Sequence, residues 1–98
     1  MSPKPVPPSI KGIYFHRLFE KDWLKLQFQS TRDHFLAKII PVFFSDPHNK
    51  SLRNHSIGGK YPGLRGIDVT GDVRAFYYQQ EDHTVTFVRI GTHSQLYG

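Results

Sequence analysis

Residues 71–98, GDVRAFYYQQEDHTVTFVRIGTHSQLYG, decide the fold predicted for this chain. Two runs of β-branched and aromatic residues, Val73–Gln79 and His83–Ile90, flank the polar turn Gln80–Asp82, which is the pattern of a β-hairpin. A shorter run of the same kind, Leu64–Val69, comes just before the hairpin. The three runs are therefore expected to form an antiparallel meander.

Arginines interrupt both strands of this hairpin, although strand propensity alone would not place them there. Arg74 lies in the first strand and Arg89 in the second, and His93 and Tyr97 follow the second strand directly. Side chains alternate between the two faces of a strand. One face of the first strand carries Arg74, Phe76 and Tyr78, and the other carries Val73, Ala75 and Tyr77. Guanidinium groups close to histidine and tyrosine predict a small site for an anion.

The N-terminal half of the chain predicts one strand followed by two helices. Lys11–Arg17 alternates apolar and polar residues as a strand does, and Leu18–Gln27 has apolar residues near helical spacing. Ser30–Asp33 offers an N-cap for a second helix, whose apolar stripe Phe35–Phe44 contains Pro41 and should kink or break there. The predicted fold is α+β, an antiparallel sheet of about four strands packed on one face by an N-terminal helical hairpin.

Ser45–Gly63 is rich in Gly, Pro, Asn and Ser and is predicted to be a loop. Functional side chains often lie on loops. The basic and imidazole side chains of this loop are His48, Lys50, Arg53, His55 and Lys60. His16 and His34, by contrast, are expected on the exposed surfaces of a strand and a helix.

The composition indicates one small domain over residues 11–98, preceded by a flexible Pro-rich tail over residues 1–10. The chain has 98 residues, no cysteine, a formal net charge of +5 and a pI near 9.7. The absence of cysteine excludes disulfides and Cys-based zinc sites, and the basic charge favours a nucleic acid or an acidic protein partner. No run is long and apolar enough to span a membrane. The start, MSPKPVPPS, lacks the apolar centre of a signal peptide, so we expect a cytoplasmic protein.

Metal-free cleavage of RNA needs a base for the ribose 2′-OH, an acid for the leaving 5′-oxygen and cations for the phosphoryl charge. The residues that could supply these parts are His55, Asp68, Asp72, Arg74, His93 and Tyr97. Either aspartate could act as base or orient a histidine, and either could instead form an ion pair with Arg74. The six histidines show neither HxH nor HxxxH spacing, so no metal site is predicted. No phosphate loop, nucleophile elbow or dinucleotide motif indicates a cofactor.

Three motifs carry a resemblance to a known family: NHSIGG at residues 54–59, GDVRAFY at 71–77 and GTHSQLYG at 91–98. Together they resemble the YafQ branch of the RelE/ParE superfamily, which contains the toxin halves of type II toxin–antitoxin pairs. The resemblance is good over residues 33–98, and the strand and helical hairpin expected over residues 11–44 agree with it.

The resemblance implies ribosome-dependent cleavage of mRNA that leaves a 2′,3′-cyclic phosphate and a 5′-OH. It implies a cognate antitoxin, and hence a toxin–antitoxin hetero-oligomer, with no membrane association. Family positions match the loop histidine His55, the acid–base positions Asp68 and Asp72, the strand Arg74, the terminal His93 and the final aromatic Tyr97. The residues expected to hold messenger or ribosomal RNA are Lys50, Arg53, Lys60, Arg65 and Arg89.

Some positions depart from the family pattern. Asp68 stands where YafQ-like toxins have histidine, and Val73 stands where an aromatic residue can occur. Arg65 and Asp68 have opposite parity along an ideal strand, so a bulge is needed if both are to face one site. ParE-like relatives share the fold but inhibit DNA gyrase without catalysis, and a gyrase inhibitor is therefore the alternative function. A third interpretation is an inert relative.

Overall fold

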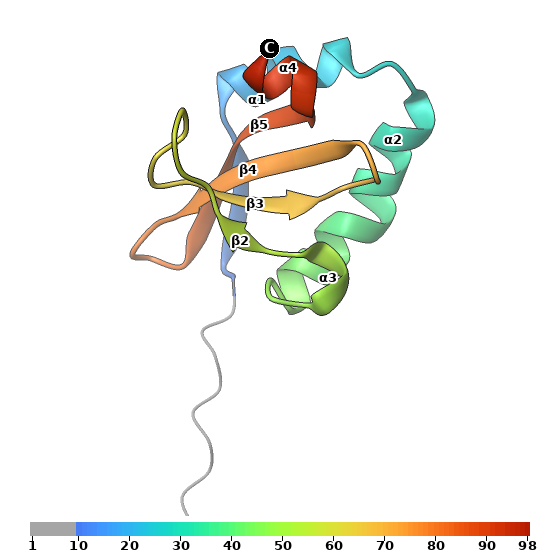
Figure 1. Ribbon diagram of the computed structural model, residues 1–98. Coiled ribbons are helices and arrows are strands. Elements are labelled where there is room, and N and C mark those ends of the chain that lie inside the picture. The colour runs from blue at the N-terminus through green and yellow to red at the C-terminus, as the bar shows by residue number, and fades with distance from the viewer. Residues whose placement is uncertain (1–9) are drawn as a thin grey trace, which may run out of the picture.

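The computed structural model describes residues 10–98, which form an α+β fold with helices against a curved sheet (Figure 1). The predicted tail falls almost wholly on residues 1–9, which lie outside the described residues. Its last residue, Ile10, is 3% exposed and belongs to the hydrophobic core. Within residues 10–98, no helix has both the length and the apolar character needed to cross a membrane.

The sheet has five strands in the order β1-β5-β4-β3-β2. Their bounds are Gly12–Phe15 (β1), His55–Ser56 (β2), Arg65–Asp68 (β3), Val73–Gln79 (β4) and Thr84–Thr92 (β5). The predicted meander of β3, β4 and β5 is confirmed, because both of its pairings are antiparallel.

The predicted α+β class is confirmed, and the sheet differs in two details from the predicted antiparallel sheet of about four strands: one pairing is parallel and there are five strands. β1 pairs with β5 in parallel, with Gly12 opposite Thr84 and Phe15 opposite Phe87. Local patterns predict hairpins, whereas a parallel pair is joined by a long crossover and leaves no local signal. The fifth strand, β2, has only two residues and pairs with β3, and it is too short to show alternation.

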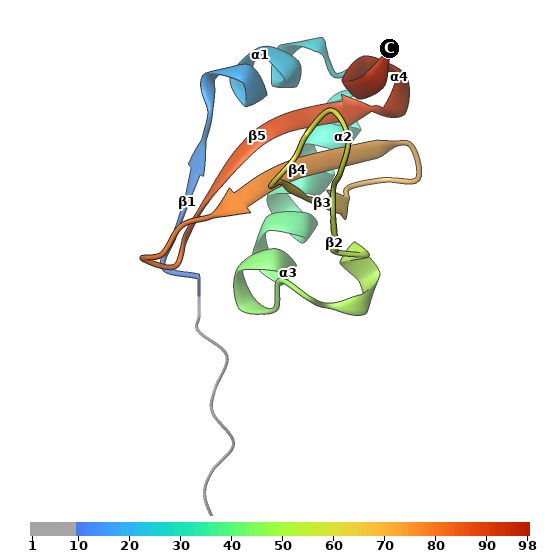
Figure 2. The same cartoon turned by 60° about the vertical axis from the view of Figure 1, so that its left-hand side comes forward.

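The predicted helical hairpin is confirmed. Its first helix is α1, Arg17–Lys25, and its second is continuous over α2 (Gln29–His34), η1 (Phe35–Ile39) and α3 (Ile40–Ser45). Figure 2 shows α1 across one end of the sheet and the second helix behind it. Two short helices complete the described fold, η2 (Lys50–Leu52) and α4 (His93–Tyr97).

Pro41 does not break the second helix, and the irregularity associated with it is a change of winding. The turn before it, η1, is a π-helix in which the Ile40 N–H donates to the Phe35 carbonyl, five residues back. Proline has no N–H to donate, and a wider turn of this type absorbs an irregularity inside a helix. The long helix therefore continues past Pro41.

The cap predicted at the start of this helix was wrong. Phe28 is the N-cap residue and makes no side-chain cap, and Thr31 is buried one turn inside. The Arg32 side chain instead joins the two helices, with Nε 3.0 Å from the Trp23 carbonyl and Nη2 2.7 Å from the Leu26 carbonyl. The Trp23 carbonyl also accepts the Leu26 N–H at 3.3 Å, so Arg32 adds a second donor there and gives a donor to the Leu26 carbonyl just beyond α1.

The core lies between the sheet and the helices. Phe43 of α3 contacts Tyr77 of β4 and Phe87 of β5, with ring centroids 4.9 and 5.2 Å apart. Phe19 of α1 and Phe35 of η1 pack on the same Phe87 ring. The predicted face Val73, Ala75 and Tyr77 is thus the core face, and the Arg74 face lies on the opposite side of the sheet.

Candidate active site

The sheet register places three candidate residues, together with Phe76, on the face opposite the helices. His55 pairs with Gly66, and Gly66 in turn pairs with Phe76. Two positions along the same pair of strands, Asp68 pairs with Arg74. Cross-strand partners share a face, so His55, Asp68, Arg74 and Phe76 belong to the same side of the sheet.

Gly66 allows this face to be densely packed. A Cβ at this position would lie 2.8 Å from Ile57 Cδ1 and 3.3 Å from the Phe76 ring. Both side chains therefore use the space that a larger residue would fill. Their approach keeps the loop after β2 close to the centre of the sheet.

The short helix α4 brings the C-terminal residues to the same face. Thr92 and Gln95 form a capping box at its start, with Thr92 N–H donating to Gln95 Oε1 at 2.8 Å. Gly91 makes room for this fold-back, because a Cβ there would lie 3.0 Å from Gln95 Oε1. His93 and Tyr97 then lie on one face of the helix, four residues apart, with ring centroids separated by 4.7 Å.

Two adjoining hollows collect these side chains. The first, about 240 Å³, is lined by His55, Arg74, His93 and Tyr97 together with Ile57, Phe76 and Leu96. The second, about 410 Å³, is lined by Asp72, Arg74 and His93 together with Gly71, Thr92 and Ser94. Arg74 and His93 line both hollows, so a single groove brings together five of the six predicted catalytic residues.

The sixth residue, Asp68, holds the central arginine. Its Oδ1 lies 3.1 Å from Arg74 Nε, and its Oδ2 lies 3.9 Å from Arg53 Nη1. The Asp68 side chain is 18% exposed and the Arg74 side chain 34%. One edge of the Arg74 guanidinium is thus fixed by a carboxylate, and the ion pair anticipated between these residues is confirmed.

The environment of His55 sets its tautomer. His55 Nδ1 lies 2.7 Å from the Arg53 carbonyl oxygen. A carbonyl only accepts hydrogen bonds, so Nδ1 carries the proton and Nε2 of the neutral ring is free to accept one. Arg53 adopts a left-handed conformation, with φ of 51°, at the end of η2. That uncommon backbone conformation immediately precedes the turn of the chain into β2.

A family model described as the bacterial toxin of a type II toxin–antitoxin system, YafQ, matches residues 11–98. The chain belongs to the YafQ family of toxins. The fold agrees with this assignment. YafQ from Escherichia coli strain BL21(DE3) superposes with a TM-score of 0.67 at 20% identity, covering 88% of this chain and 97% of that one.

Two further structures resemble this toxin. The E. coli DinJ–YafQ toxin–antitoxin complex gives a TM-score of 0.64 at 22% identity and covers 88% of this chain and 96% of that chain. The Helicobacter pylori protein HP0894 gives 0.62 at 26% identity and covers 88% and 98%. Functionally curated sequences give no significant match.

Two predicted RNA-binding arginines of the toxin lie outside the groove. Arg65 pairs with Tyr77 and so faces the helices, and its Nε donates to Asn54 Oδ1 at 2.8 Å. The register of β3 against β4 runs without interruption from Arg65 to Asp68. The bulge that would have brought both residues to one face is therefore not present.

Arg89 is the second of these arginines, and its donors are occupied. Nε lies 2.6 Å from Asp22 Oδ2, Nη2 lies 3.1 Å from Asp22 Oδ1, and Nη1 lies 2.9 Å from the Tyr61 hydroxyl. The hydrogen bonds with Asp22 raise the pKa of Arg89 above its ordinary value. The guanidinium is thus a permanent charge shared between α1 and the loop that contains Tyr61.

The remaining predicted RNA contacts are exposed side chains that line neither hollow. Lys50 and Arg53 are exposed on and just after η2. Lys60 Nζ lies 3.4 Å from the Leu96 carbonyl, which places it beside α4. Within residues 10–98 no three His, Cys, Asp or Glu side chains are gathered as metal ligands would be.

Sequence reasoning missed Asp22 and Tyr61. The Tyr61 hydroxyl donates to the Leu96 carbonyl of α4 and accepts from Arg89, which Asp22 holds in place. This network connects α1, β5 and α4, and it secures the helix that presents His93 and Tyr97. A signal was available, because Asp22 occurs three residues after Phe19 and four before Leu26, on the apolar face of a helix.

Proposed function

We propose that this toxin is a ribosome-dependent mRNA endoribonuclease that cleaves RNA through the ribose 2′-OH without a metal ion or other cofactor. The observation that carries the proposal is the groove itself, in which two imidazoles, a guanidinium and a phenol line one hollow. A non-catalytic gyrase inhibitor has no need for that combination. The groove is open at the surface, as a site for a polymer must be.

His55 supplies the general base in the proposed reaction. Its Nε2 takes the proton from the 2′-OH, and the resulting 2′-oxygen attacks the adjacent phosphorus. His93 in its protonated form gives a proton to the departing 5′-oxygen. The products are a 2′,3′-cyclic phosphate and a 5′-OH. Asp72 lines the same hollow as His93, and in this mechanism its carboxylate orients the imidazole.

Arg74 stabilises the negative charge that develops on the phosphoryl oxygens. Asp68 acts through Arg74, because its Oδ1 forms an ion pair with Arg74 Nε at 3.1 Å. It is therefore a positioning residue in this mechanism and not the base. Tyr97 is 39% exposed and contacts His93 with the two rings tilted by 32°, and it offers a ring on which an unpaired base can stack.

Exposed cations hold the remaining RNA. Lys50, Arg53 and Lys60 are exposed, and their contacts to messenger or ribosomal phosphates would weaken as salt rises. Arg65 and Arg89 make their observed contacts within the protein, and their contribution is to the shape of the site. Cleavage on the ribosome places the toxin in the cytoplasm.

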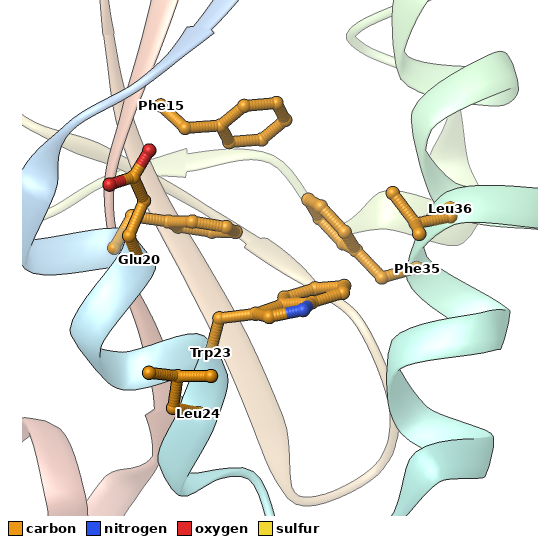
Figure 3. A pocket seen from close by; sticks show the side chains of 7 residues that line it. Phe15, Glu20, Trp23, Leu24, Phe35 and Leu36 are labelled. Atoms are coloured by element: carbon orange, nitrogen blue, oxygen red, sulfur yellow. The ribbon is translucent and has the colours of Figure 1, made fainter.

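The second partner is a cognate antitoxin, as the DinJ–YafQ complexes illustrate for a relative. A groove of about 410 Å³ between α1 and the long helix is lined almost entirely by apolar side chains (Figure 3). Trp23, Leu24, Phe35 and Leu36 line it, and Leu24 is 79% exposed. An apolar surface of this kind marks an interaction site, and an amphipathic segment of the antitoxin would cover it.

Expression of wild-type toxin and His93→Ala tests the proposed function. The wild type is expected to cause rapid mRNA loss, with cyclic phosphate at the new 3′ ends, and the variant is expected to leave mRNA intact. Plasmid supercoiling is followed in the same cells. Intact mRNA with altered supercoiling would identify a gyrase inhibitor, and growth unaffected by either protein would identify an inert relative.

A further inference from the structure

A third hollow, of about 420 Å³, lies next to the β3–β4 turn and is separate from the two hollows of the proposed active site. One wall is the middle of the long helix, and the other is formed by η2 and the end of β3. Its floor is apolar, and polar and basic side chains stand around it. The floor residues are Ile39, Val42, Leu52 and Val69. This volume falls in the range of small-molecule sites, which is about 300–1,000 Å³.

The third hollow adjoins the proposed active site. Gly71 lines both this hollow and the one that contains Arg74 and His93. A Cβ at Gly71 would meet nothing within 4 Å, so no side chain crowds the turn at this position. The three hollows thus lie next to one another around the β3–β4 turn, with the proposed site of cleavage in the middle. In Figure 1 this turn lies between α4 and the long helix.

The helix wall of the third hollow carries unused basic groups. His34 and Lys38 both line the hollow and are exposed. They lie four residues apart and so share a face of the helix. Within residues 10–98, neither side chain forms a hydrogen bond or an ion pair. Asp68 is the acidic residue of the lining, and its charge is already paired with Arg74 at 3.1 Å and Arg53 at 3.9 Å.

We propose that the third hollow binds the nucleotide next to the cleaved linkage, an inference that rests on the proposed ribonuclease function. The apolar floor receives the base, which is a flat and largely apolar surface. Lys38 meets the phosphate of that nucleotide, and His34 adds a second donor. The RNA strand then bends around the β3–β4 turn, with its scissile phosphate beside Arg74. The site thereby recognises more of the strand than the reacting linkage alone.

Binding of non-cleavable RNA tests this subsite without relying on catalysis. Short 2′-O-methyl oligonucleotides are titrated against the full chain, starting from a dinucleotide and adding one nucleotide to the 5′ or the 3′ side. We expect one of the two extensions to tighten binding to the wild type. Lys38→Ala should remove most of that gain, roughly fivefold in Kd, and should lower the slope of log K against log salt by about one.

Lys11→Ala is the matched control, because it deletes the same charge at an exposed position that lines none of the three hollows. Equal effects of Lys38→Ala and Lys11→Ala would overturn the subsite, as would the absence of a gain in binding from both extensions.

Cross-linking gives a second test. A photoreactive base on the favoured extension should cross-link within residues 38–42, 51–52 or 69–71, and cross-links found only elsewhere would also overturn the subsite. Cleavage of mRNA by the wild type, with no Lys38 effect, would leave the ribonuclease function standing while the subsite falls. A gain in binding that depends on Lys38, found with a protein that does not cleave mRNA, would leave the nucleotide site standing while the ribonuclease function falls.

Discussion

At the scale of single residues, Arg74 shows how one side chain can serve both the sheet and the groove. Its Nε is held by Asp68, and its Nη1 lies 3.5 Å from the carbonyls of Thr70 and Gly71. A guanidinium fixed on one edge loses less freedom when the other edge meets a phosphate. The same ion pair that joins β3 to β4 thus fixes the guanidinium to which we assign phosphate binding in the proposed mechanism.

Tyr61 offers the clearest single-residue test of how α4 is positioned. Tyr61→Phe keeps the ring contacts with Phe76 and Tyr97 at 5.1 and 5.5 Å but removes the hydroxyl that joins Arg89 to Leu96. We expect the free energy of unfolding to fall by about 1–2 kcal/mol. Cleavage should fall mainly in kcat, because α4 then holds His93 less firmly, with little change in KM.

Tyr14→Phe is the control for this change, since Tyr14 is 59% exposed on β1 and its hydroxyl makes no hydrogen bond within residues 10–98. Urea unfolding and steady-state cleavage are measured on both variants. A Tyr61→Phe protein that is less stable but cleaves at the wild-type kcat would show that the network serves folding alone.

Single residues also show which parts of the site could be predicted from the sequence. Alternation along Val73–Gln79 correctly separated Arg74 from the core, because a strand has a fixed two-residue period. The same rule predicts that Arg65 and Asp68 lie on opposite faces of a regular strand, and the uninterrupted register of β3 against β4 confirms it. The Asp22–Arg89 pair joins residues 67 positions apart, and no local pattern encodes such a partner.

At the scale of elements, the β4–β5 turn contains a hydrogen-bonded carboxylate that responds to pH. Asp82 Oδ1 accepts from the Thr84 hydroxyl at 2.6 Å and the Thr84 N–H at 3.0 Å. These bonds lower the pKa of Asp82 below its ordinary value of 3.8. The ionised carboxylate therefore stabilises the turn above the unfolded-state pKa, and that contribution disappears as pH falls through the lower, folded-state pKa.

Asp82→Asn tests this linkage. The variant cannot titrate at this position, so its stability should fall less steeply than that of the wild type as pH drops below about 4. Urea midpoints measured between neutral and acidic pH compare the two slopes. Glu81→Gln removes one charge from the same turn without removing a hydrogen bond and should follow the wild type. Parallel curves for Asp82→Asn and the wild type would contradict the prediction.

Elements differ in how readable they are from sequence. The β4–β5 hairpin and the two helices follow from periodicity. Pro41 within an apolar stripe predicted a kink or break, whereas the helix accommodates it with a π-helical turn. The start of the long helix was misplaced because Arg32 bonds to carbonyls of α1, a contact that exists only after the hairpin has formed. The two-residue β2 depends entirely on its partner β3.

At the scale of the whole molecule, the surface proposed to cleave RNA and the surface proposed to bind the antitoxin are separate. The groove with His55, Arg74 and His93 lies on the open face of the sheet, and the apolar groove of Figure 3 lies between the two long helical segments. Phe15 and Trp23 line the apolar groove, and neither lines any of the three hollows around the β3–β4 turn. Toxicity and neutralisation should therefore be separable by mutation.

Leu24→Asp makes that separation testable. Leu24 is 79% exposed, so the substitution should change the free energy of unfolding by no more than about 0.5 kcal/mol. It introduces a charge into an apolar groove, where a partner segment would have to bury it without compensation. We expect the variant to arrest growth as the wild type does but to escape neutralisation when the antitoxin is co-expressed, and to be lost from the co-purified complex.

Phe44→Asp is the control. It places the same charge on α3 at a side chain that is 47% exposed and lines none of the four hollows, and it should remain fully neutralised. If both variants are neutralised equally, the antitoxin acts without this groove, and the apolar surface must be assigned to another partner.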